Sequence, residues 1–191
     1  MPRTARSIVG QEIYHVLNRG NGRATVFRED ADYVQFIHLL RHGKSDYPIS
    51  LYGYCLMPNH FHLILRPDDA DAMGCFMQWL LTTHVRRHHQ RLQTSGHVWQ
   101  GRYKSFRIEG DAHLLMVMRY VERNPVRAGL ATSARHWRWS SHRERLGLDL
   151  ASLVDPAPID LPRRWGAYVD RPLLEGDLDR IRRSIRRQFP Y

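Results

Sequence analysis

Four stretches of the chain have the hydrophobic patterns of β-strands: residues 12–19, 49–57, 60–66 and 103–108. In the first and last, apolar and polar residues alternate, and a period of two is typical of strands because successive side chains point to opposite faces of a sheet. The middle two are apolar runs separated only by Pro58 and Asn59, which are turn residues. These two strands are therefore expected to form an antiparallel hairpin.

Three further stretches place apolar residues three and four positions apart, which predicts amphipathic helices over residues 28–43, 69–93 and 111–124. The first helix is expected to stop near Gly43. Asp111 is expected to cap the third, and Pro125 to end it after Asn124. The order strand, helix, strand, strand, helix, strand, helix predicts an α+β fold of the ferredoxin-like split βαβ type, with an antiparallel sheet and one additional helix.

The pattern changes after Gly147. Residues 148–172 are rich in proline and predict an irregular arm, and residues 178–189 combine apolar positions on one face with five arginines. We therefore expect one domain over residues 1–147 and a basic, proline-containing extension over residues 148–191. The arginine-rich end is expected to bind nucleic acid or fold back on the domain; an acidic membrane or a partner is the weaker alternative.

The charge of the chain favours an anionic partner. Lys and Arg number 29 against 19 Asp and Glu, for a net charge of +10, and Lys44 and Lys104 are the only lysines. Arginine is well suited to phosphate, so a nucleic-acid partner is favoured, although an arginine bias also arises from the codons of a GC-rich genome. Cys55 and Cys75 give neither a disulfide framework nor a zinc finger. No membrane span or signal segment is visible, so a cytoplasmic protein is expected.

Two histidines are candidates for metal binding. His60 and His62 flank Phe61, and alternation along a strand places both imidazoles on one face while Phe61, Leu63 and Leu65 point to the other. Two imidazoles on a rigid strand can bind a divalent metal, but such a pair is also typical of a hydrogen-bonded structural pair.

Tyr120 and Asn124 lie one helical turn apart, on one face of the third helix. An amide oxygen together with two imidazoles suits Mg²⁺ or Mn²⁺, and a phenol beside the metal can attack a phosphodiester. By spacing alone, Tyr120 is more typical of a core residue than of a catalytic one, because it lies among apolar positions 114, 117, 118 and 121. Asn124 is likewise consistent with simply ending the helix before Pro125.

Five co-linear segments between Ile13 and Gly147 resemble the REP-associated tyrosine transposases, which belong to the single-tyrosine HUH transposase superfamily. The segments read IYHVLNRGNGRATVFREDADYVQF, YCLMPNHFHLIL, VWQGRYKSFRIE, LLMVMRYVERNPVRAGL and WRWSSHRERLG. The resemblance implies that His60 and His62 are the paired histidines of the HUH motif, that Tyr120 is the nucleophile and that Asn124 completes the metal site.

The same resemblance implies an activity. Family members cleave and rejoin single-stranded DNA beside palindromic REP hairpins, with a divalent metal, through a 5′-phosphotyrosine and a free 3′ hydroxyl. It further implies a monomer whose tyrosine acts at the metal site of its own subunit. The expected partners are therefore single-stranded or hairpin DNA.

Seven cations lie on or near the predicted site in sequence and are candidates for DNA contact: Arg19, Arg23, Arg102, Lys104, Arg107, Arg123 and Arg127. His84 and His88 have the spacing of a zinc pair, but the Glu of a His-Glu-x-x-His motif is absent and arginines surround them. We therefore expect a basic helix face that is open to DNA, with metal binding as the lesser alternative.

Three other functions are compatible with parts of the sequence. A domesticated hairpin-binding protein without turnover is the main alternative, although retention of His60, His62, Tyr120 and Asn124 together favours catalysis. An RNA-binding ferredoxin-like domain would carry aromatic stacking motifs on its central strands, which RYKSFRIE matches poorly. A zinc hydrolase would need an acid or base partner that the sequence does not reveal.

Overall fold

The computed structural model describes residues 8–149, 153–179 and 181. Its centre is a four-stranded antiparallel sheet with the strand order β2-β3-β1-β4. The strands are β1 (Tyr14–Arg19), β2 (Ile49–Met57), β3 (His60–Pro67) and β4 (Lys104–Arg107). The predicted hairpin is present as β2 and β3. The strand order and the helices between the strands confirm the predicted split βαβ pattern.

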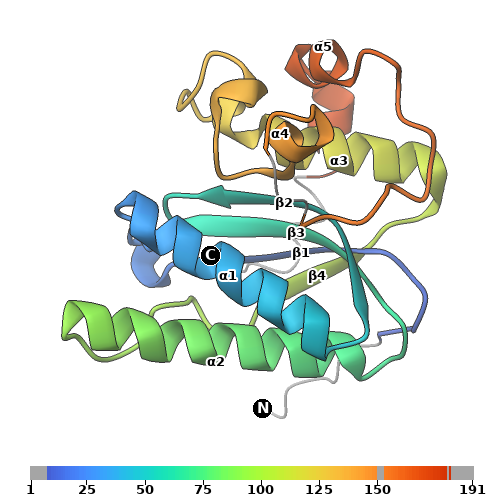
Figure 1. The fold of residues 1–191 in the computed structure, drawn as a ribbon. Coiled ribbons are helices and arrows are strands. Elements are labelled where there is room, and N and C mark those ends of the chain that lie inside the picture. Colours follow the sequence, from blue (N-terminus) through green and yellow to red (C-terminus); the bar gives the residue numbers. More distant parts are fainter. Residues whose placement is uncertain (1–7, 150–152, 180, 182–191) are drawn as a thin grey trace.

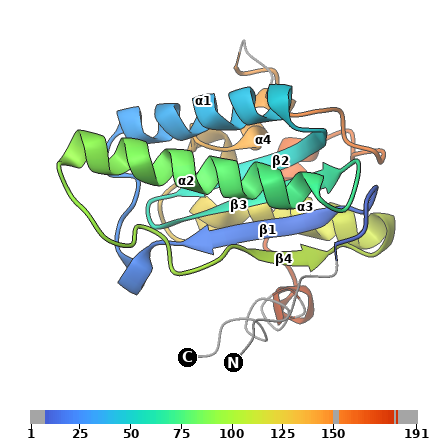
Figure 2. The ribbon, with the colours of Figure 1, turned by 90° about the horizontal axis from the view of Figure 1, so that it is seen from below.

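Helices cover both faces of the sheet. The long helices α1 (Asp30–Asp46) and α2 (Ala72–Leu92) lie side by side on one face, and α3 (Gly110–Arg127) crosses the other (Figure 1). Figure 2 shows α1 and α2 in front of the sheet and α3 behind it. Short elements complete the fold: η1 (Asn21–Arg23), η2 (Ala134–His136), α4 (Ser141–Arg145) and α5 (Trp165–Asp170).

The alternation of β3 divides its side chains between two cores. Phe61, Leu63 and Leu65 are fully buried in the core under α1 and α2, where each contributes about 1.5–3 kcal/mol of hydrophobic stabilisation. Ile64 packs in a second core under α3, which also contains Tyr120. His62 has the same parity as Ile64 and therefore faces α3. The sequence prediction for the two faces of this strand is confirmed.

Two helices extend beyond their predicted ends. α1 passes through Gly43 to Asp46, because this glycine does not break the helix but lets α2 approach it closely. A Cβ atom built at Gly43 would lie 2.6 Å from the Phe76 ring and 2.7 Å from the Trp79 ring. The helix therefore ends at Asp46, slightly beyond the predicted stop near Gly43, and close packing rather than backbone flexibility explains the glycine.

The third helix differs from its prediction at both ends. α3 runs through Pro125 to Arg127, and its N-cap is Glu109, so Asp111 lies inside the first turn. Pro125 removes one backbone donor, but the turn closes beyond it, because the amides of Ala128 and Leu130 donate to the carbonyls of Asn124 and Pro125 at 2.9 Å. Asn124 is therefore inside the helix and does not end it.

The described part of the extension packs against the domain. The predicted irregular arm contains helix α5, whose Trp165 and Val169 join Tyr120 in the core under α3. Asp155 binds the edge of β2: its carboxylate accepts the Leu51 amide at 2.8 Å, and the Lys44 ammonium donates to the same carboxylate at 2.7 Å. The predicted helix over residues 178–189 lies almost wholly outside the described residues, and the division at residue 147 stays a prediction.

Among the helices that the structure describes, none combines the length and the apolar character needed to cross a membrane.

Candidate functional site

Helix α3 places Tyr120 over the sheet face that displays His62. The Tyr120 ring centroid lies 5.8 Å from that of His62 and 6.2 Å from that of His15 on β1, edge-on in both cases. Tyr120 is 5% exposed. Three elements that are distant in sequence therefore meet at one point, and the predicted nucleophile lies beside a predicted metal ligand.

Hydrogen bonds fix which nitrogen of His60 is free. Its Nδ1 lies 2.7 Å from the amide oxygen of Asn59, whose own Nδ2 donates to the Arg23 carbonyl. An amide oxygen only accepts, so Nδ1 of His60 donates and Nε2 keeps its lone pair. The His60 side chain is thus available as a nitrogen ligand.

His62 has a different partner. Its Nδ1 lies 2.8 Å from Nε2 of His15, while its Nε2 is buried and has no hydrogen-bond partner among the described residues. A buried imidazole nitrogen without a partner is costly unless something else binds it. A metal ion fits this position, because it would take up the lone pair of Nε2.

All three histidines are held in the neutral form that a metal ligand requires. Burial lowers the pKa of His60 to about 3, and the charges of Arg19 and Arg127 act in the same direction. Burial also lowers the pKa of His62 well below its usual range, with smaller effects of His60 and His15. For His15, burial and then His113 lower the pKa to about 3.

Asn124 lies one turn after Tyr120 and is fully buried. Its Nδ2 donates to the Tyr120 carbonyl at 3.0 Å, and its Oδ1 accepts a hydrogen bond from the Arg127 guanidinium at 2.8 Å. Because a carbonyl oxygen has two lone pairs, Oδ1 can still serve as a ligand. Within the described part of the chain, no group of three or more His, Cys, Asp or Glu side chains could hold a metal, which fits a site made of two imidazoles and an amide.

Three of the predicted DNA-binding cations gather at this site. Arg19 ends β1 directly opposite His60. Burial lowers the pKa of Arg19, as do the charges of Arg23 and Arg127, whereas Tyr120 acts in the opposite sense. The Arg127 guanidinium carbon lies 5.5 Å from the centre of the Tyr120 ring. Arg19 and Arg127 therefore place positive charge beside Tyr120.

The other four cations are distributed differently. Lys104 pairs with Leu17 and so shares the sheet face of His62. Arg107 forms an ion pair with Glu12 at 2.8 Å, and the guanidinium of Arg123 donates to the Asp170 carbonyl at 3.3 Å. Arg102 is exposed and borders a groove along α2. No contact among the residues that the structure describes brings these last three to Tyr120.

No local pattern in the sequence indicates the buried carboxylate that holds α3 in place, Glu122. Glu122 is 1% exposed and accepts hydrogen bonds from four side chains at 2.7–3.0 Å: Ser141, His142, Arg145 and Trp165. It follows Tyr120 by two positions, so it leaves the helix on roughly the opposite side. Glu122 thereby ties α3 to α4 and α5 behind the site.

The prediction for His84 and His88 is wrong. They are only 1% and 8% exposed, and the His84 ring packs against the rings of Phe36 and Trp99 at 5.1 and 5.2 Å. Their positions continue the series Met73, Met77 and Leu80 on the inner side of α2. That continuation of the apolar period was the available signal, and it places both imidazoles in the core rather than on a face open to DNA.

Comparison with known proteins identifies the family of the chain. The family model described as "Transposase IS200 like" matches residues 9–124, a range that includes His60, His62, Tyr120 and Asn124. A Haemophilus influenzae protein named as a REP-associated tyrosine transposase is 27% identical over 159 residues, which cover 77% of this chain and 84% of that protein.

A solved structure shares the fold. A REP-associated tyrosine transposase bound to a REP hairpin aligns with a TM-score of 0.62 and 16% identity, over 85% of this chain and 96% of that one. A Deinococcus radiodurans protein described as a transposase aligns with a TM-score of 0.46 and 19% identity, over 64% and 97%, a likeness too weak to add to the assignment. Since the family match spans more than half of the sequence, the chain belongs to the IS200-like transposase family.

Proposed function

We propose that this protein cleaves and rejoins single-stranded DNA at REP-type palindromic hairpins through a covalent 5′-phosphotyrosine on Tyr120. The observation that carries the proposal is the position of the Tyr120 ring, 5.8 Å from the ring of His62, in a chain of the IS200-like transposase family. Beside Tyr120 lie a buried imidazole whose Nε2 has no partner among the described residues and the charged side chains of Arg19 and Arg127, a setting that suits phosphate chemistry better than an ordinary core.

In the proposed reaction, the Tyr120 phenolic oxygen attacks the scissile phosphorus. A new P–Oη bond forms as the P–O3′ bond breaks, the phenolic proton is lost to solvent, and the departing 3′ oxygen takes up a proton. The 5′ phosphate is then linked to Tyr120, and the 3′ hydroxyl is free. Reversal of these bond changes rejoins the strand, because the phosphotyrosine retains the energy of a diester.

The side chains around Tyr120 would bind the metal and the phosphate. His60, His62 and Asn124 would hold Mg²⁺ or Mn²⁺, which when bound supplies Lewis-acid polarisation of the phosphate and a template for its orientation. Arg19 and Arg127 bind phosphate oxygens on the sheet face and above the phenol, respectively. Burial of Tyr120, which is 5% exposed, limits the access of bulk water to the phenol.

A hairpin substrate is supported by the fold neighbour, which is a REP-associated tyrosine transposase bound to a REP hairpin. The net charge of +10 fits a phosphate backbone. The chemistry at Tyr120 requires an unpaired strand that can bend into the site, so we propose that the stem is bound and the flanking single strand is cut.

The test is incubation of the purified protein with Mn²⁺ and a library of single-stranded DNA hairpins with randomised flanks, followed by a denaturing gel and peptide mapping. We expect a chelator-sensitive adduct on Tyr120. Tyr120→Phe should bind hairpins and form no adduct, and His60→Ala should form none because a metal ligand is lost. Tyr52→Phe is the matched control, since Tyr52 is a buried tyrosine of the same core and should leave the adduct intact.

An adduct on another residue, or cleavage by Tyr120→Phe, would contradict the role of Tyr120. Hairpin binding by the wild-type protein without any adduct across the library would instead favour a non-catalytic hairpin-binding protein.

A further inference from the structure

We propose that His15 is a positioning residue for the metal site: by accepting a hydrogen bond from Nδ1 of His62, it fixes the tautomer in which Nε2 of His62 is free to bind the metal. This inference rests on the proposed function. The two nitrogens are 2.8 Å apart in a buried environment, and the two rings are stacked with centroids 5.0 Å apart.

The direction of this hydrogen bond follows from proton counting. A neutral imidazole carries one N–H and one lone pair. If Nε2 of His15 donated, His62 would have to carry its own proton on Nε2, and that buried N–H would be unpaired and unable to bind a metal. If Nδ1 of His62 donates, its Nε2 presents a lone pair. Only the second arrangement is competent for metal binding.

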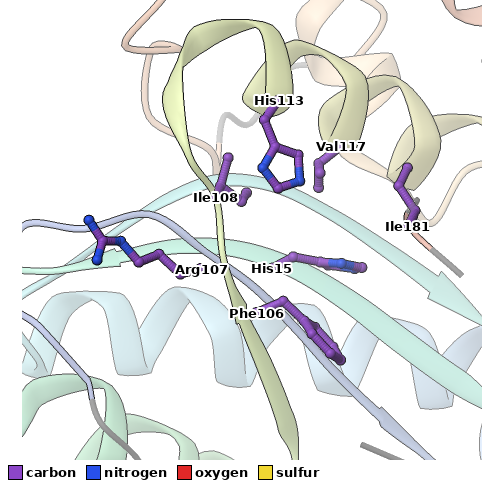
Figure 3. A pocket seen from close by; sticks show the side chains of 7 residues that line it. All are labelled: His15, Phe106, Arg107, Ile108, His113, Val117 and Ile181. Carbon is purple, nitrogen blue, oxygen red and sulfur yellow. The ribbon is translucent and has the colours of Figure 1, made fainter. Parts of the chain in front are cut away.

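The second arrangement requires the proton of His15 to be on Nδ1, and a cavity next to this ring accommodates it. The cavity has a volume of about 20 Å³ and is lined by His15, Phe106, His113 and Val117, among others. Figure 3 shows the His113 ring extending from α3 toward the strand that carries His15. This volume is enough for about one water molecule.

His113 contributes the second donor that makes such a water favourable. Its Nδ1 accepts the backbone amide of Glu109 at 3.0 Å, so the neutral ring carries its proton on Nε2. A water in the cavity can accept from Nδ1 of His15 and from Nε2 of His113, using both lone pairs. A water in this cavity would hold the proton of His15 on Nδ1, which leaves Nε2 of His15 free to accept from Nδ1 of His62.

The first measurement uses the metal-free wild-type protein. A two-bond ¹H–¹⁵N correlation spectrum of the imidazoles reports which nitrogen of each histidine is protonated. We expect His62 to be protonated at Nδ1 and His15 at Nδ1. A proton on Nε2 of His62 would overturn the proposal whatever any variant does.

The second measurement is Mn²⁺ affinity without DNA, by calorimetry. His15→Phe keeps an aromatic ring but removes the acceptor, so the affinity should fall about 10- to 100-fold. His15→Gln places an amide oxygen near the position of Nε2 and should keep most of the affinity. His84→Phe is the control, because His84 is an equally buried histidine in the other core, and its loss should leave Mn²⁺ affinity unchanged.

The outcomes separate this inference from the proposed function. Wild-type affinity in His15→Phe would overturn the role of His15 and leave the metal site standing. Failure of the wild-type protein to bind Mn²⁺ would overturn both. An equal loss in His15→Phe and His84→Phe would show general destabilisation and would also overturn the specific role.

Discussion

Replacement of Glu122 by Gln tests whether the position of α3 depends on a buried charge. The substitution preserves the side-chain volume but replaces one carboxylate oxygen with an NH₂ group. That NH₂ group would face the side chains that donate hydrogen bonds to the carboxylate, so at least one of these donors would lose its acceptor. Arg145 and His142 are 8% and 0% exposed at their side chains, so neither can turn to water. Removal of one partner from a buried ion pair typically costs about 3–5 kcal/mol. For a chain of this size, that loss corresponds to a melting temperature lower by about 6–20 °C.

The assay is urea unfolding at pH 7 for the wild type, Glu122→Gln and Glu12→Gln. The last is the control, because Glu12 pairs with Arg107, whose side chain is 53% exposed, and such surface pairs contribute about 0–1 kcal/mol. A loss for Glu122→Gln no larger than that for Glu12→Gln would refute the reasoning.

The stability difference between wild type and Glu122→Gln should also depend on pH. Burial alone would raise the pKa of Glu122, but the hydrogen bonds and charges of His142 and Arg145 outweigh it, so the pKa is lowered on folding. A lowered carboxyl pKa contributes stability that is present above the unfolded pKa of about 4.3 and is lost as pH falls through the folded value. The stability gap between wild type and Glu122→Gln should therefore narrow below about pH 4.

Two further predictions concern packing and buried imidazoles. Gly43→Ala should destabilise the fold by up to about 2 kcal/mol in urea unfolding, because a clash with Phe76 of about 1–3 kcal/mol exceeds the gain in helix propensity of about 1 kcal/mol. Gly74→Ala in α2 should stabilise it, since no described atom lies within 4 Å of the added Cβ, and equal effects of the two changes would contradict this account. Stability should also fall as pH drops below about 6.5, by about 1 kcal/mol per pH unit for each histidine whose pKa burial has lowered, because the unfolded chain takes up those protons first. His84→Phe should lower the slope of unfolding free energy against pH by the contribution of about one proton. An unfolding free energy that does not change between pH 6.5 and 5 would contradict the role of the buried histidines.

Much of the chemistry was predictable because it is local. Alternation along residues 60–66 placed His60 and His62 on one face, and a spacing of four placed Asn124 one turn after Tyr120. The predictions failed at residues whose role depends on contacts with residues distant in sequence. Gly43 resembles a helix stop in the sequence, but in the structure it allows α2 to pack closely. His84 resembles a residue of a basic surface, but in the structure it is buried.

The sequence by itself determined the order of strands and helices, the faces on which the paired histidines lie and the family of the chain, because periodicity and motifs depend on neighbouring residues. Only the tertiary structure decided that α3 lies across the sheet with Tyr120 beside His62, that His15 contacts His62 and that Glu122 fastens the helix from behind. These contacts join residues 47 positions apart for His15 and His62 and 43 apart for Glu122 and Trp165. They depend on strand register and on the docking of one layer against another, which a local pattern does not encode.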